Sequence, residues 1–195
     1  LADRVAAVRE RIARATTRSL RPENGVRLVA VSKRHPVSAV REAHALGLRV
    51  FGENYAQELI AKAADAGPLE NIEWHMIGHV QSRKADLIPA NFALMHSLDS
   101  LKLANRLERC AAERPLPVLL EFNVGGEETK SGWQASDESR WNEFLREIDM
   151  MLKLRRLTMR GLMKMPPLFD DPERTRPYFK KLSRLRNFLK QNFPA

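Results

Sequence analysis

The sequence predicts a parallel α/β fold from the alternation of its strands and helices, and the residues at the strand ends favour a TIM-type (β/α) barrel within that class. Short apolar runs rich in β-branched residues alternate six times with amphipathic segments after a leading helix, as in parallel sheets with crossover helices. Polar, chemically capable residues directly follow most of these runs. In a barrel such strand ends converge on one face, whereas in an open doubly wound sheet only those at the switch point meet.

The first elements follow from spacing and from turn residues. Five apolar residues at steps of four and three predict a helix over residues 1–16 with one buried face: Leu1, Val5, Val8, Ile12 and Ala15. Residues 27–33 read as a strand buried on both faces. Pro36 then begins a helix, where its missing N–H costs nothing, and Gly47 ends it.

Five further units of the same kind follow along the chain. We expect strands at 49–52, 72–77, 92–96, 117–123 and 157–163, and helices from about 54, after 81, and over 100–113, 136–153 and 173–190. Eight units close a standard barrel. We therefore expect a single domain over residues 1–195 whose last two strand–helix units are absent from this chain.

Composition narrows the class of protein. The chain has 195 residues, 44% of them apolar, with no apolar run long enough to span a bilayer. Cys110 is the only cysteine, so an intrachain disulfide is excluded, and a cytoplasmic protein is the simplest prediction. The net charge of +9 fits a polyanionic partner, a phosphorylated ligand or simply a solvated basic surface.

Lys33 is the first candidate for chemistry. It ends the strand that contains Val29-Ala-Val-Ser32, so we expect it to be partly desolvated. Desolvation disfavours the ammonium form and leaves a neutral amine that can attack an aldehyde. The alternative is a lysine whose amine merely extends from the strand end into water.

Six motifs in order resemble the pyridoxal 5′-phosphate (PLP) homeostasis family. They are Ala30-Val-Ser-Lys33, Phe51-Gly-Glu-Asn-Tyr55 with Gln57-Glu58, Ile72-Glu-Trp-His75 with Ile77-Gly-His79 and Gln81-Ser82, His96-Ser97 with Asp99-Ser100, Lys130-Ser-Gly132, and Gly161-Leu-Met163. The resemblance implies a fold similar to the N-terminal barrel of alanine racemase. It also implies that Lys33 holds PLP as a Schiff base, in a protein that buffers or carries PLP without conventional catalytic turnover.

Four other residues are candidate PLP contacts. Asn54 follows the second strand, although its spacing to Gln57 also fits a helix cap. His79 and Met163 could line the faces of the pyridine ring or simply pack. The resemblance makes Lys130 a secondary PLP contact or transfer point, and a solvated loop charge is the alternative. His75 and His79 are four residues apart, but no third ligand is evident, so we expect no metal site.

The chain departs from the family pattern in two places. His35 stands where the family often has a second lysine, and the Ser-Met-Gly-Met-Ser-type and Arg-Ile-Gly segments that supply phosphate-binding backbone are absent.

Two other function classes remain open. One is an amino-acid racemase, which would need a second domain and a tyrosine acid/base, and the only tyrosines are Tyr55 and Tyr178. The other is a nucleic-acid-binding protein, suggested by the basic last helix. That helix also carries an apolar stripe, Tyr178, Leu182, Leu185 and Leu189, which favours the outer helix of a barrel. We expect a monomer whose partners are PLP and apo PLP-dependent enzymes, with no membrane association.

Overall fold

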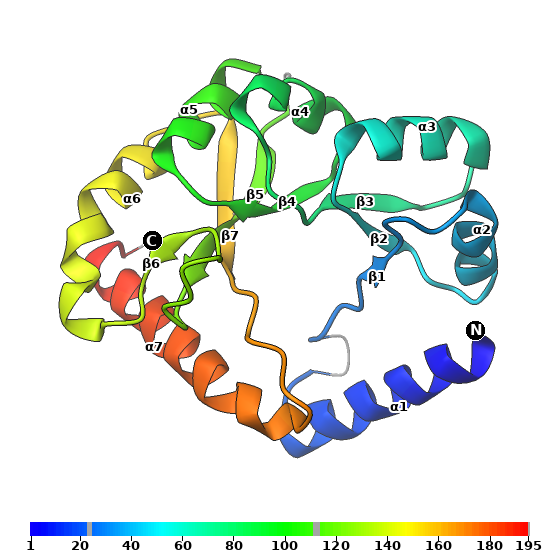
Figure 1. The fold of residues 1–195 in the computed structure, drawn as a ribbon, viewed down its shortest axis with the longest axis horizontal. Coiled ribbons are helices and arrows are strands. Elements are labelled where there is room, and N and C mark those ends of the chain that lie inside the picture. The colour runs from blue at the N-terminus through cyan, green and yellow to red at the C-terminus, as the bar shows by residue number, and fades with distance from the viewer. Residues whose placement is uncertain (23–24, 111–113, 195) are drawn as a thin grey trace. The chain divides into compact units, whose positions relative to one another are not determined.

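A computed structural model describes residues 1–22, 25–110 and 114–194 (Figure 1). The chain forms two compact units, Leu1–His75 and Met76–Ala195. Strands alternate with helices in both units, and the strand pairings described within each unit are parallel. The predicted parallel α/β class is therefore confirmed within each unit.

The first unit is a small three-stranded sheet with its helices. Its elements are α1 (Ala2–Arg18), β1 (Ala30–Val31), α2 (Val37–Ala45), β2 (Val50–Glu53), α3 (Ala56–Ala66) and β3 (Glu73–Met76). The strands lie in the order β1-β2-β3. Ala30 faces Phe51 and Val31 faces Gly52 across the β1–β2 pair. This register brings the segments that follow the two strands to one edge of the sheet.

Local sequence explains where α2 begins and ends. Pro36 is its N-cap, one residue before the position at which it was predicted to begin the helix. Gly47 follows the helix with φ +78°, a left-handed conformation that glycine adopts without a steric penalty. The helix then packs on a core made of Val5, Val40, Ala43, Leu48 and Phe51.

The second unit is built around one central strand. Its elements are η1 (Ser82–Lys84), α4 (Leu87–Asn91), β4 (Leu94–Leu98), α5 (Leu101–Cys110), β5 (Leu116–Asn123), β6 (Trp133–Gln134), η2 (Glu138–Phe144), α6 (Leu145–Leu152), β7 (Leu157–Met163), η3 (Pro172–Thr175) and α7 (Arg176–Asn192). The central strand β5 pairs in parallel with β4, with β7 and, at its carboxyl end, with β6 (Figure 1).

The helix α7 confirms the predicted apolar stripe. Leu185 and Leu189 are buried, and Tyr178 and Leu182 are half-buried. Its basic residues lie on the other side, where Arg184 pairs with Glu138 and Arg176 with Glu173. The basic charge of this helix is thus partly neutralised by neighbouring carboxylates.

Several expected boundaries were wrong. Of the five apolar residues predicted to face a core from α1, only Val5 is buried, and Leu1 is 50% exposed. The first strand spans only Ala30–Val31 instead of 27–33, and the fourth lies at Leu94–Leu98 instead of 92–96. The first half of the helix expected at 136–153 is a 3₁₀ segment, and β6 was not predicted. The expected end of α5, residues 111–113, lies outside the described residues.

No helix within the described ranges is long and apolar enough to cross a membrane.

Candidate functional site

Lys33 and Asn54 occupy equivalent positions at the carboxyl ends of neighbouring strands. The amide of Ser32 donates to the carbonyl of Gly52 (3.1 Å) and so continues the β1–β2 ladder by one residue. Continuing the same register places Lys33 beside Asn54, which is half-buried. The helix-cap alternative for Asn54 is wrong, because Tyr55 is the N-cap of α3 and no side chain caps this helix.

The side chain of Lys33 is exposed, which contradicts the expected desolvation. The first strand ends at Val31, and Val31 is itself 51% exposed, so this strand end lies at the surface of its unit. Burial therefore supplies no argument for a neutral amine at Lys33. An aldehyde can reach the amine because the Lys33 side chain is exposed and because hydrogen bonds fix the backbone on both sides of it.

A buried ionic network lies directly beneath this strand end. The Lys62 ammonium donates to Glu53 Oε1 (2.6 Å), to the carbonyl of Ser32 (2.8 Å) and to Glu58 Oε1 (3.2 Å). The hydroxyl of Ser32 donates to the same Glu53 oxygen (2.7 Å). Glu53 is 0% exposed and Lys62 only 7% exposed, so each charge depends on the other for compensation.

This network holds the backbone on both sides of Lys33. Before it, the carbonyl of Ser32 accepts from Lys62 (2.8 Å) and from the amide of His35 (3.0 Å). After it, the amide of Arg34 donates to Glu58 Oε1 (2.7 Å). That backbone hydrogen bond lowers the pKa of the Glu58 carboxyl below its usual value, despite an opposing desolvation effect.

The turn after Lys33 is strained. Arg34 has φ +61°, a left-handed conformation that costs a non-glycine residue roughly 1–2 kcal/mol. The hydrogen bond from Arg34 to Glu58 and the one from His35 to Ser32 offset this cost. Lys33 is therefore presented on a tight turn that is fixed from below, while its own side chain points to an accessible surface.

Sequence reasoning missed Lys62, although a signal for it existed. Lys62 lies three residues after Leu59 and four before Ala66, on the buried face of α3. A lysine within an apolar helical stripe needs a buried acidic partner. Glu58, four residues earlier, and Glu53, at the end of the preceding strand, supply two.

The second unit carries its own group of polar residues near the ends of β3, β4 and β5. His79 is exposed, and its Nδ1 lies 2.9 Å from Asp99 Oδ2. Glu121, near the end of β5, is only 7% exposed. Desolvation raises the pKa of Glu121, the Asp99 charge raises it further, and His79 and Lys130 oppose the shift. These four side chains therefore share one electrostatic environment.

The loop that carries Lys130 is ordered by Asn123, at the end of β5. The Asn123 amide donates to the carbonyl of Glu127 (2.6 Å) and its oxygen accepts from the amide of Gly126 (2.9 Å). At the far end of the loop, Gly132 has φ +98°, and a Cβ there would lie 2.3 Å from the backbone oxygen of Glu121. Lys130 itself is half-buried.

Met163 is the last residue of β7, and Lys164 directly follows it. Met163 is half-buried, and Lys164 is buried at 8% exposure. Its Nζ has no hydrogen-bond partner among the described residues, and it lies 4.2 Å from the ring centre of Tyr178. The desolvation that we expected at Lys33 is found at this lysine instead.

The described residues contain no group of three or more His, Cys, Asp or Glu side chains that could hold a metal ion. His75 is buried with its Nε2 3.6 Å from Glu73 Oε2, and desolvation lowers its pKa. His79 pairs with Asp99 instead. The spacing of four between these histidines thus leads to two separate carboxylate contacts.

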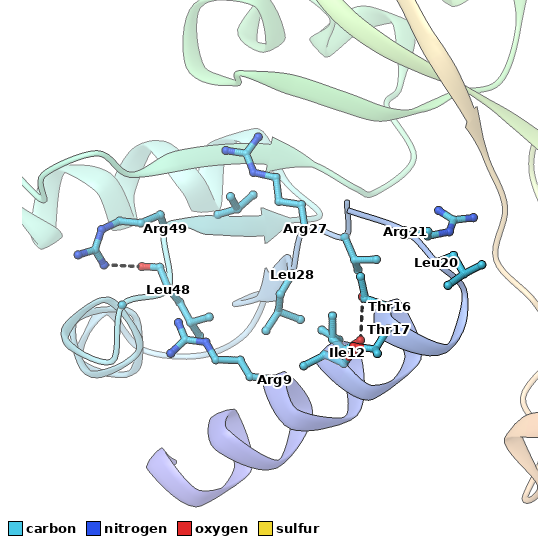
Figure 2. Close-up of a pocket in the computed structure, with 14 residues that line it drawn as sticks. Arg9, Ile12, Thr16, Thr17, Leu20, Arg21, Arg27, Leu28, Leu48 and Arg49 are labelled. Carbon is cyan, nitrogen blue, oxygen red and sulfur yellow. Dashed lines mark hydrogen bonds between the residues drawn. The ribbon is translucent and has the colours of Figure 1, made fainter. Parts of the chain in front are cut away.

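A groove of about 930 Å³ lies in the first unit between α1 and the segments that lead into β1 and β2 (Figure 2). Among the described residues, the charged side chains that line it are all arginines: Arg9, Arg21, Arg27 and Arg49. It lies at the amino ends of these strands, whereas Lys33 and Asn54 follow their carboxyl ends. Sites in (β/α) barrels are built at carboxyl ends, so we do not assign the PLP site to this groove.

The chain is similar in sequence to one domain family and to a set of relatives that share one name. Residues 4–195 match the sequence model of the alanine racemase N-terminal domain family. The pyridoxal phosphate homeostasis protein of Aquifex aeolicus is 38% identical over 194 residues, which are 98% of this chain and 82% of the relative. The protein of the same name from Pseudomonas aeruginosa is 44% identical over 168 residues, covering 85% of this chain and 70% of the relative.

Solved structures agree with these matches. PipY of Synechococcus elongatus PCC7942, solved with PLP bound, superposes with a TM-score of 0.77 at 36% identity, covering 94% of this chain and 84% of PipY. Alanine racemase of Clostridium difficile 630 superposes with a TM-score of 0.65 at 16% identity, covering 91% of this chain and 47% of the racemase. The second likeness shows the fold alone.

The fold prediction is thus confirmed as the alanine racemase N-terminal type, a parallel α/β fold consistent with a TIM-like barrel. With relatives up to 44% identical and 70–82% covered, the chain belongs to the pyridoxal phosphate homeostasis protein family.

Proposed function

We propose that this protein binds PLP and serves PLP homeostasis, with Lys33 holding the cofactor as a Schiff base. The observation that carries the proposal is the turn at Lys33, where an accessible lysine follows a strand end and its backbone is fixed on both sides. The relatives named above support it, because they carry the homeostasis name and PipY was solved with PLP bound.

The residues of each unit fit the chemistry of PLP. In the first unit, Lys33 supplies an amine for the aldehyde, and the half-buried Asn54 supplies an amide that can hydrogen-bond a ring substituent. In the second unit, His79, Lys130 and Met163 offer a ring nitrogen, an ammonium and an apolar face. We propose all five as PLP contacts and residues 1–195 as one PLP-binding domain.

We propose a carrier role without conventional turnover. Catalysis on PLP needs a positioned acid/base partner within hydrogen-bond reach of the reacting carbon. Neither tyrosine sits at a strand end: Tyr55 is 55% exposed at the start of α3, and Tyr178 lies in α7. Racemase-like turnover is the second candidate, and the racemase-type fold is its only support here.

A carrier must give up what it holds, and the exposed side of Lys33 suits transfer. We propose apo PLP-dependent enzymes as acceptors, with a monomer in the cytoplasm as the acting form. Nucleic acid is not proposed as a partner, because the apolar stripe of α7 packs inward and two of its arginines, Arg176 and Arg184, pair with carboxylates.

A PLP titration followed by visible absorption tests the proposal. Wild-type protein should develop the absorption band of a protein-bound Schiff base, and Lys33→Ala should lose it while keeping its far-UV circular dichroism. Lys102→Ala, at an exposed lysine of α5, is the matched control and should retain the band. A band that survives in Lys33→Ala would refute the assignment. Amino-acid turnover above that of free PLP, abolished by Lys33→Ala, would refute the carrier role.

A further inference from the structure

Lys164 is an unusual lysine, because burial leaves its amine without a hydrogen-bonding partner. The residue is 8% exposed, and its Nζ has no hydrogen-bond partner among the described residues. A buried ammonium normally has a carboxylate or carbonyl partner, since leaving it unpaired is costly. Lys62 in the first unit meets that expectation with three acceptors, and Lys164 does not.

Aromatic rings surround the amine instead. Nζ lies 4.2 Å from the ring centre of Tyr178 and 5.7 Å from that of Phe179. Tyr178 packs in turn on Phe169, with ring centres 5.9 Å apart. Such rings attract a cation but replace none of the hydrogen bonds that water would make. The neutral amine is the form that this environment tolerates best.

The charges near Lys164 partly cancel. Glu127, in the loop after β5, favours the ammonium, and Lys181 on α7 disfavours it. Desolvation is the largest effect and lowers the pKa of Lys164 to about 8. Compared with the ordinary value of 10.5, the neutral amine is then roughly 300-fold more abundant at pH 7.

Two features make the amine reachable. Lys164 directly follows β7, at the carboxyl end of the strand, where (β/α) proteins build their sites. On one side its amine faces the ring of Phe179, a surface residue that is 50% exposed. Exposed side chains change rotamer within nanoseconds, so this ring can move aside and admit a small aldehyde.

We propose that Lys164 is a second aldehyde-reactive amine of this protein, which forms an imine with PLP when PLP is in excess. The proposal rests on the proposed function for its choice of aldehyde. In the reaction the neutral Nζ attacks the aldehyde carbon, a C–N bond forms, and the carbonyl oxygen leaves as water. The step involves no oxidation or reduction.

Borohydride trapping with peptide mapping tests the proposal on the full chain. Protein is mixed with excess PLP at pH 7, 8 and 9, reduced, and each lysine is scored for the PLP mass. Label at Lys164 should rise with a midpoint near pH 8 and should exceed label at Lys180 at least tenfold at pH 7. Lys180 is the control because it is exposed on the same helix that covers Lys164.

The variants separate this inference from the proposed function. Lys33→Ala should keep the Lys164 label, and Lys33→Ala/Lys164→Met should lose it. If PLP labels Lys33 but labels Lys164 no faster than Lys180, this inference fails and the assignment of Lys33 stands. Label at Lys164 without Lys33 would overturn the assignment of Lys33 and leave this inference standing. If the methionine variant does not fold, the wild-type ratio of Lys164 to Lys180 still decides.

Discussion

Replacing Lys62 with methionine should strongly destabilise the first unit. Methionine has a similar length and no charge, so Lys62→Met removes the ammonium and leaves packing largely unchanged. Glu53 is 0% exposed, and its Oε2 already has no hydrogen-bond partner among the described residues. Without Lys62 its carboxylate would keep only the Ser32 hydroxyl, 2.7 Å from Oε1.

The expected loss follows from the burial of this pair. Removing one partner of a buried ion pair costs about 3–5 kcal/mol, because the remaining charge stays desolvated. The Lys62 variant also loses hydrogen bonds to Ser32 and Glu58. We therefore expect the free energy of unfolding to fall by about 4 kcal/mol. Urea unfolding followed by circular dichroism measures it.

Two controls separate charge from packing. Lys153→Met breaks an exposed pair with Asp149, whose atoms are only 2.5 Å apart, and should cost less than about 1 kcal/mol. The double variant Glu53→Gln/Lys62→Met removes both buried charges and should recover at least about 2 kcal/mol relative to Lys62→Met. The reasoning fails if Lys62→Met costs no more than Lys153→Met, or if the double variant loses as much as the two single variants combined.

Two further changes test the second unit. Glu121→Gln should raise the free energy of unfolding at pH 7. Burial raises the pKa of Glu121 in the folded protein above the unfolded value of 4.5. The stability that the protonated carboxyl contributes is therefore fully present below pH 4.5 and is lost as pH rises through the folded pKa. Thermal unfolding at pH 4 and pH 7 checks this, and an equal change at both pH values would contradict it. Gly132→Ala should destabilise by about 1–3 kcal/mol, because φ is +98° and the new Cβ would lie 2.3 Å from the Glu121 oxygen. An unchanged melting temperature would show that the loop relaxes freely.

Much of the fold could be predicted because local patterns and tertiary structure agree. The β-branched runs became parallel strands, and Pro36 and Gly47 bound α2 where turn chemistry places them. The failures lie where tertiary context decides. The apolar stripe of α1 predicts burial, yet only Val5 of that stripe is buried. Residues 133–134 carry no strand signal of their own, and they pair because β5 offers Phe122 and Asn123.

The site was predictable in its residue types but not in its electrostatics. The motifs placed Lys33 and Asn54 at neighbouring strand ends, as the register of β1 and β2 implies. Desolvation was assigned to Lys33, but the strand that carries it ends early at Val31 and leaves it exposed. The buried lysines are Lys62, which has partners, and Lys164, which has none among the described residues. Burial depends on the neighbouring elements, and a strand-end position alone does not determine it.

The central claim is that Lys33 is the first site that PLP occupies. One equivalent of PLP, added at pH 7 and trapped with borohydride, tests it most directly when the labelled peptide is identified by mass spectrometry. Most of the label should lie on Lys33, on the accessible turn between Ser32 and Arg34. Label spread over exposed lysines, or concentrated on Lys62, Lys130 or Lys164, would contradict it.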